Sequence, residues 1–138
     1  MQEIKELKLL QANLQVFYQK LSNIHWNISG LEFFEMHEEV DKLREEVLSF
    51  IDEVAEKVLM KESLALGSFK ELLELSNIKE LSSQDFKYQK ATEIITSDLK
   101  TILNQVEEFE WSKRVQPIMD EILLSLDKWL WQFSKLVK

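Results

Sequence analysis

The scarcity of helix-breaking residues is the feature that most constrains the fold of this chain. The 138 residues include only two glycines and one proline, whereas average usage is about 7% glycine and about 5% proline. These three residues, Gly30, Gly67 and Pro117, each lie at one of three breaks in the chain. Because few positions favour a turn, the sequence predicts long helices with few connections.

Apolar residues recur at spacings of three and four in four segments, which is typical of helices that bury one face. The first helix should end at Ser29-Gly30, where glycine can adopt the left-handed conformation. The second should run from residues 32–34 to about Met60, the third over about 86–110, and the fourth from Pro117, which suits a helix start. The expected core positions are Ile4, Leu7, Leu10, Leu14, Phe17, Leu21, Ile24, Ile28, Val40, Leu43, Val47, Phe50, Ile51, Val54, Val58, Leu59, Ile94, Ile95, Leu99, Ile102, Leu103, Val106, Ile118, Ile122, Leu123, Leu126, Leu130, Phe133 and Leu136.

The connections between these segments predict the topology. The short link at Gly30 indicates an antiparallel hairpin of the first two helices. Residues 62–85 are irregular apart from a short helix expected over Phe69 to Leu75. A connection of about 24 residues is too long for a tight turn and suits the long crossover of a ferritin-like bundle. We therefore expect an all-α, four-helix bundle that forms a single domain over residues 1–138.

Composition excludes several classes of function. The chain has no cysteine, which removes disulfides, thiolate metal sites and cysteine nucleophiles together. Its amino-terminal residues lack the apolar segment of a secretory signal, and no apolar run reaches the roughly 18 residues that span a bilayer. We therefore expect a soluble, cytoplasmic protein. The formal net charge of −8 argues against unaided binding to the phosphate backbone of DNA.

Four side chains form a candidate metal site. His25 and His37 are the only histidines, and Asp52 and Glu56 follow one helical turn apart. Histidines with paired carboxylates suit iron, zinc or manganese. Taken singly, each residue has an ordinary interpretation: His25 as a buried or interface histidine, and the two acids as a solvated helix face.

Spacing decides what kind of site these residues can form. If residues 33–60 are one helix, His37, Asp41, Asp52 and Glu56 lie on a stripe roughly 100° wide. His37 and Asp52 are fifteen residues apart, which is about 22 Å along a helix axis, whereas metal–ligand bonds are about 2 Å long. One subunit therefore cannot close both ends of this stripe around one ion. If all four groups bind one centre, two chains must meet antiparallel about a two-fold axis.

The motifs around these residues resemble the Dps family, the ferritin-like mini-ferritins named as DNA-binding proteins from starved cells. The resemblance covers nearly the whole chain. It is carried by His25-Trp26-Asn27-Ile28-Ser29-Gly30, Phe33-Phe34, Met36-His37-Glu38 and Asp52-Glu53-Val54-Ala55-Glu56-Lys57. It implies that His25 and His37 bind iron together with Asp52 and Glu56 of a neighbouring subunit. It also implies that Asp41 matches a carboxylate that supports a second iron in some members.

The resemblance further implies a hollow dodecamer, built from two-fold dimers, that oxidises Fe(II) with hydrogen peroxide. Such a shell stores ferric mineral and protects against oxidative stress. Trp26 has two interpretations, core packing or electron donation to a reactive oxidant beside the metal. Asp41 has a second one as well, because Arg44 and Glu45 follow it at the spacing of ordinary surface charge pairs.

Two alternatives of other classes stay open. The chain could be a chromosome-compacting structural protein with a secondary metal site, although the charge of −8 and the lack of a Lys-rich amino-terminal extension speak against DNA binding. It could also form a shell whose site holds zinc or manganese and has no oxidase activity.

Overall fold

The computed structural model describes residues 2–137 and contains four long helices and one short one. The helices are α1 (Gln2–Asn27), α2 (Phe33–Met60), α3 (Phe69–Leu75), α4 (Tyr88–Glu108) and α5 (Gln116–Ser134), followed by a 3-10 turn, η1 (Lys135–Val137). Between residues 2 and 137 there is no strand, only an isolated bridge between Ile28 and Phe86. This confirms the all-α class and the predicted bounds of the short helix.

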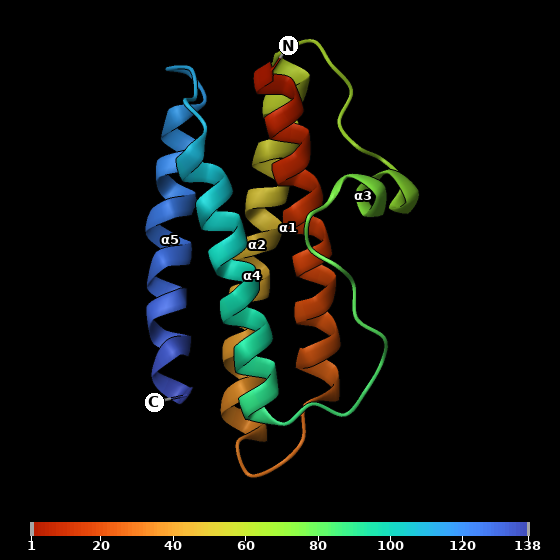
Figure 1. The fold of residues 1–138 in the computed structure, drawn as a ribbon, viewed down its shortest axis with the longest axis vertical. Helices are drawn as coiled ribbons and strands as arrows, with labels where there is room; N and C mark the ends of the chain where they lie inside the picture. Colours follow the sequence, from red (N-terminus) through yellow and green to blue (C-terminus); the bar gives the residue numbers. More distant parts are fainter. Residues whose placement is uncertain (1, 138) are drawn as a thin grey trace.

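The long helices form two antiparallel hairpins packed into one bundle (Figure 1). The α1–α2 pair and the α4–α5 pair lie side by side, and α1 contacts α4 while α2 contacts α5. The connection from α2 to α4 runs the length of the bundle and carries α3 against the outside of α1 (Figure 1). The predicted long crossover between the second and third bundle helices is therefore confirmed.

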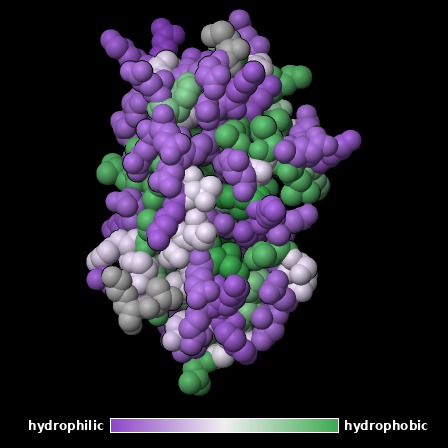
Figure 2. Space-filling view, in the orientation of Figure 1, coloured by the Kyte–Doolittle hydropathy of each residue, from purple (hydrophilic) through white to green (hydrophobic). Residues whose placement is uncertain are grey.

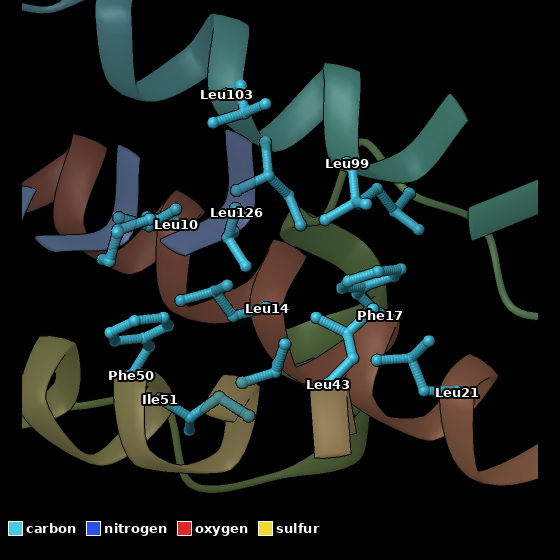
Figure 3. Packing of buried hydrophobic residues seen from close by; sticks show 14 of the residues in the cluster. Leu10, Leu14, Phe17, Leu21, Leu43, Phe50, Ile51, Leu99, Leu103 and Leu126 are labelled. Atoms are coloured by element: carbon cyan, nitrogen blue, oxygen red, sulfur yellow. The ribbon is translucent and has the colours of Figure 1, made fainter. Parts of the chain in front are cut away.

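The predicted apolar stripes face one another in the bundle interior (Figure 3). Leu14 and Phe17 of α1 meet Leu43 of α2, Leu99 of α4 and Leu126 of α5 in one continuous core. Two predicted core positions are wrong, because Leu59 and Leu136 are 53% and 45% exposed. Both lie near the end of a helix, where the partner helices no longer cover the stripe. Four others are only half-buried: Ile4, Ile94, Leu123 and Leu130.

The α2 helix ends at Met60 without a glycine. The backbone of Glu62 takes a φ of +62°, and two hydrogen bonds close the helix: Glu62 N to Leu59 O at 2.9 Å and Ser63 N to Val58 O at 3.2 Å. This is the Schellman arrangement, which usually places glycine at the left-handed position. The helix therefore ends where the apolar pattern predicted, although Glu62 is not a residue that favours the left-handed conformation.

Polar side chains of α1 hold the irregular crossover in place. Gln11 bonds both backbone groups of Leu66, donating at 2.9 Å and accepting at 3.1 Å. Oδ1 of Asn13 accepts hydrogen bonds from Ser76 Oγ and Asn77 N, each at 2.8 Å. Because these buried groups have partners, the crossover is anchored without regular structure of its own.

The far end of the crossover is tied to the α1–α2 turn. Ser29 N donates to Phe86 O at 3.0 Å, and Phe86 N donates to Asn27 O at 3.1 Å. Gly30, with a φ of +114°, makes the turn itself. This network holds the end of the bundle at which α1 stops and α2 begins.

A buried ion pair joins α1 to α4. Lys20 Nζ lies 2.7 Å from Asp98 Oδ2, and both residues are less than a tenth exposed. Burial raises the pKa of the Asp98 carboxyl, while the hydrogen bond and the charge of Lys20 act in the opposite direction. The pair therefore links the two hairpins at some electrostatic cost.

The face of the molecule drawn in Figure 2 is largely polar. Figure 2 shows a face on which hydrophilic residues predominate and apolar patches lie between them. Among residues 2–137, no helix is both long and apolar enough to cross a membrane.

Candidate metal centre

The two histidines meet at the closed end of the α1–α2 hairpin. His25 lies in the last turns of α1 and His37 near the start of α2. Their rings stack with centroids 3.8 Å apart and planes 11° apart. The antiparallel hairpin that the short link at Gly30 predicted therefore brings the two histidines together within one chain.

Reciprocal hydrogen bonds determine which ring nitrogens are free. Nδ1 of His25 lies 2.7 Å from the backbone oxygen of His37, and Nδ1 of His37 lies 2.6 Å from that of His25. Because a carbonyl oxygen can only accept, both Nδ1 atoms must carry the proton. The Nε2 atom of each neutral ring then has its lone pair available, which is the state that binds a metal.

The environment of His25 favours the neutral ring. Burial lowers the pKa of His25, and electrostatic interactions with His37 and Arg44 lower it further. The hydrogen bond to the His37 carbonyl and the charge of Asp41 raise the pKa but do not outweigh burial. The imidazole is therefore held in the form that can coordinate a cation without first losing a proton.

Asp41 lies beside this pair but is already engaged. Its Oδ1 is 3.8 Å from Nε2 of His25. The same oxygen accepts hydrogen bonds from Nε and a terminal nitrogen of Arg44, at 3.1 and 2.7 Å. The carboxylate thus has an ion-pair partner within its own helix.

Trp26 lies on the surface next to this cluster. Its side chain is 60% exposed, so the interpretation of Trp26 as core packing is wrong for this chain. The central carbon of the Arg44 guanidinium is 5.5 Å from the centroid of the Trp26 ring, within the range of a cation–π contact.

Asp52 and Glu56 lie far from the histidines. Both are exposed on α2, which is a single helix from Phe33 to Met60, so the separation of about 22 Å along its axis applies. Within the described chain, 2–137, no group of three histidine or acidic side chains could hold a metal ion. Within one chain, the structure thus brings His25, His37 and Asp41 together, whereas Asp52 and Glu56 lie far from this cluster.

The interpretation of Asp41 and Arg44 as a charge pair along one helix is confirmed, but the sequence reasoning did not place Tyr18, Ser22 or Arg44 beside the histidines. Tyr18 and Ser22 precede His25 by seven and three residues, and Arg44 follows His37 by seven. Spacings of three, four and seven put side chains on one helix face, so this pattern on both helices could have found them.

Comparison with known proteins identifies the class. Residues 4–137 match the family described as the ferritin-like domain, and the bundle with its long crossover has the same architecture. The chain is a ferritin-like protein. A DNA protection during starvation protein from Brevibacillus brevis is 30% identical, over 89% of this chain and 86% of its own length. The chain therefore belongs to the Dps family.

Other relatives agree over nearly the full length. The DNA protection during starvation protein of Helicobacter pylori is 28% identical, over 97% of both chains. A Dps protein from Vibrio cholerae O1, described as a member of a broad superfamily of ferritin-like diiron-carboxylate proteins, has a TM-score of 0.93 and 26% identity. That match covers 99% of this chain and 90% of the other.

Proposed function

We propose that this protein is an iron-storage mini-ferritin whose Fe(II)-oxidising site is shared between two subunits. His25 and His37 of one subunit would bind the substrate Fe(II) together with Asp52 and Glu56 of the partner subunit. The observation that carries the proposal is the stacked histidine pair, in which both Nδ1 atoms are bonded and both Nε2 atoms are available. His37 lies on the same α2 helix as two exposed carboxylates that are too distant to reach it. Membership of a family that includes a protein described as diiron-carboxylate supports iron as the metal.

The exposed apolar residues of α2 support the same pairing of subunits. Phe34 is 74% exposed and lies near His37, while Leu59 is 53% exposed and lies near Glu56. An antiparallel two-fold that brings His37 onto the carboxylates of the partner subunit also brings Phe34 onto Leu59 of the partner subunit. Apolar surface of this kind is stabilised by association, so one axis serves both packing and metal binding.

The residues would act on Fe(II) through charge and geometry. Neutral imidazoles and carboxylates together bind Fe(II), and the carboxylates favour the harder Fe(III), so they assist loss of an electron. Overall, the two sites of a two-fold dimer would oxidise two Fe(II) ions for each hydrogen peroxide molecule, which takes up two electrons and two protons and leaves as two waters. Trp26, which is exposed beside the site, would give an electron to a stray oxidant.

Storage would follow from assembly. We infer a hollow dodecamer of two-fold dimers, in which the ferric product collects as mineral. The net charge of −8 would favour cations at the protein surface. The biological outcome would be protection against the oxidative damage caused by free iron and peroxide.

The variant Asp52→Ala tests the site. It should slow Fe(II) oxidation by at least about tenfold, since loss even of groups that only support metal ligands costs 10- to 100-fold, while the particle elutes unchanged. Glu53→Ala is the matched control, because it removes a neighbouring exposed carboxylate that lies off the stripe. Oxidation that is equally fast in Asp52→Ala would contradict the proposed site, and dissociated subunits would show that Asp52 is structural.

Size-exclusion chromatography after addition of Fe(II) and peroxide tests storage. Many irons per subunit should co-elute with a particle of about twelve subunits. A large particle that carries few irons would remove the storage role. A particle that takes up zinc or manganese but does not oxidise Fe(II) would favour the shell without oxidase activity.

A further inference from the structure

Arg44 lies beside the candidate site and donates hydrogen bonds to side chains on both helices of the α1–α2 hairpin. On α2, its Nε and one terminal nitrogen donate to Asp41 Oδ1, at 3.1 and 2.7 Å. On α1, its other terminal nitrogen donates to Ser22 Oγ at 3.2 Å. Hydrogen bonds to one residue of α1 and one residue of α2 therefore fix the position of the guanidinium.

Two aromatic rings complete the surroundings of this guanidinium. Its central carbon lies 5.5 Å from the ring centroid of Trp26 and 5.9 Å from that of Tyr18, distances at which a ring face attracts a cation. The side chain of Arg44 is only 17% exposed. Because arginine does not lose its proton in proteins, a permanent positive charge lies beside the histidines.

The Arg44 guanidinium is bonded to the Asp41 carboxylate, which is the group that a second metal ion would need. Asp41 Oδ1 is 3.8 Å from Nε2 of His25, so a free Asp41 could reach an ion bound near that nitrogen. The two hydrogen bonds that Arg44 donates to Asp41 are charge-assisted and therefore stronger than hydrogen bonds between neutral groups. A divalent ion at Asp41 would have to displace the guanidinium or lie against a like charge.

We propose that Arg44 keeps Asp41 out of the metal site, so that each site binds one divalent ion and not two. The inference rests on the proposed function, because it concerns the same intersubunit site. The bound ion uses His25, His37 and the partner subunit's carboxylates, and the guanidinium takes the place of a second ion. Arg44 is thus a positioning residue that sets the metal count.

Zinc retained after gel filtration measures this count, because Zn²⁺ has no redox chemistry and forms no mineral by oxidation. The zinc retained by Asp52→Ala is subtracted from each value to remove ions bound elsewhere on the acidic surface. The wild-type protein should retain one zinc per subunit, and Arg44→Gln should retain two. The double variant Arg44→Gln/Asp41→Asn should return to one, because the freed carboxylate is then absent.

Ser22→Ala is the matched control for Arg44. It removes the hydrogen bond of Arg44 to α1 and leaves the Asp41 pair, so its zinc count should stay at one. Two zincs per subunit in the wild type, or one in Arg44→Gln, would overturn the inference. A wild type that retains no more zinc than Asp52→Ala would instead overturn the proposed site itself.

Diffraction from crystals of the zinc-loaded wild-type protein tests the same inference without relying on the folding of a variant. Anomalous scattering should give a single peak near Nε2 of His25, with Arg44 still bonded to Asp41. A second peak coordinated by Asp41, with Arg44 turned away, would overturn the inference.

Discussion

At the residue scale, the conformation of Gly30 decides how the histidines are presented. Its φ of +114° lies in a region that residues with a side chain rarely adopt. The Gly30 carbonyl accepts a hydrogen bond from Phe33 N at 3.2 Å, which begins α2 four residues before His37. The geometry of the histidine pair therefore depends on one backbone angle.

We expect Gly30→Ala to lower the free energy of unfolding by about 1–3 kcal/mol, the usual cost of a strained backbone conformation. A Cβ at this position would meet nothing nearer than Glu32 Oε1 at 3.7 Å, so the cost is conformational and not a clash. Urea unfolding at a fixed subunit concentration measures it, because association also affects apparent stability.

Gly67→Ala provides the matched control. A Cβ there would have no heavy atom within 4 Å, and Gly67 has no positive φ. This change should leave stability unchanged or raise it by about 0.4–1 kcal/mol, through a less flexible unfolded chain. Equal losses for the two alanine variants would contradict the role assigned to the Gly30 backbone.

At the scale of the helices, the pair of Lys20 and Asp98 is a buried ion pair between α1 and α4. Removal of one partner leaves the other charge buried and alone. We expect Lys20→Met, which leaves the Asp98 carboxylate without its partner, to destabilise the protein by about 3–5 kcal/mol. The double variant Lys20→Met/Asp98→Leu should recover most of this loss, because an apolar pair of similar size avoids the desolvation cost.

The pair also predicts a pH dependence. The pKa of Asp98 is raised in the folded protein, so the folded state binds this proton more tightly than the unfolded state. Its contribution to stability is present below the ordinary aspartate pKa and is lost as the pH rises through the raised value. The wild type should therefore gain stability relative to the double variant as the pH falls toward 4, in unfolding experiments across that range. A constant difference would show that Asp98 does not titrate in this way.

At the scale of the whole molecule, charge argues against the DNA-compacting alternative. The chain has 25 acidic and 17 basic residues, and one of the lysines, Lys20, is buried in an ion pair. Binding to the DNA backbone gains free energy from counterions that clustered lysines and arginines release. The acidic excess instead favours repulsion from phosphate.

We expect no retardation of plasmid DNA by the assembled protein in a gel at low salt, about 50 mM. A DNA-binding member of the family, run in parallel, would show that the assay detects retardation. Retardation by this protein that disappears as salt is raised would favour the alternative, since it would indicate direct contacts with phosphate.

Much of the fold could be predicted because helix formation depends on local pattern. The spacing of apolar residues and the three helix breakers determined the four long helices and the short one, and the Gly30 turn determined that His25 and His37 converge. The spacing of His37 and Asp52 also predicts the need for a second subunit, since the rise of a helix is constant.

Only the tertiary structure decided how polar groups find partners. The stacked histidines with bonded Nδ1 atoms, the Arg44 guanidinium between Asp41 and Trp26, and the anchoring of the crossover by Gln11 each join separate elements. Periodicity identifies the face on which a side chain lies but not the group that it meets, because that group comes from a distant part of the chain. The exposure of Leu59 has the same origin: its pattern is that of a core residue, and the packing of the neighbouring helices leaves it uncovered.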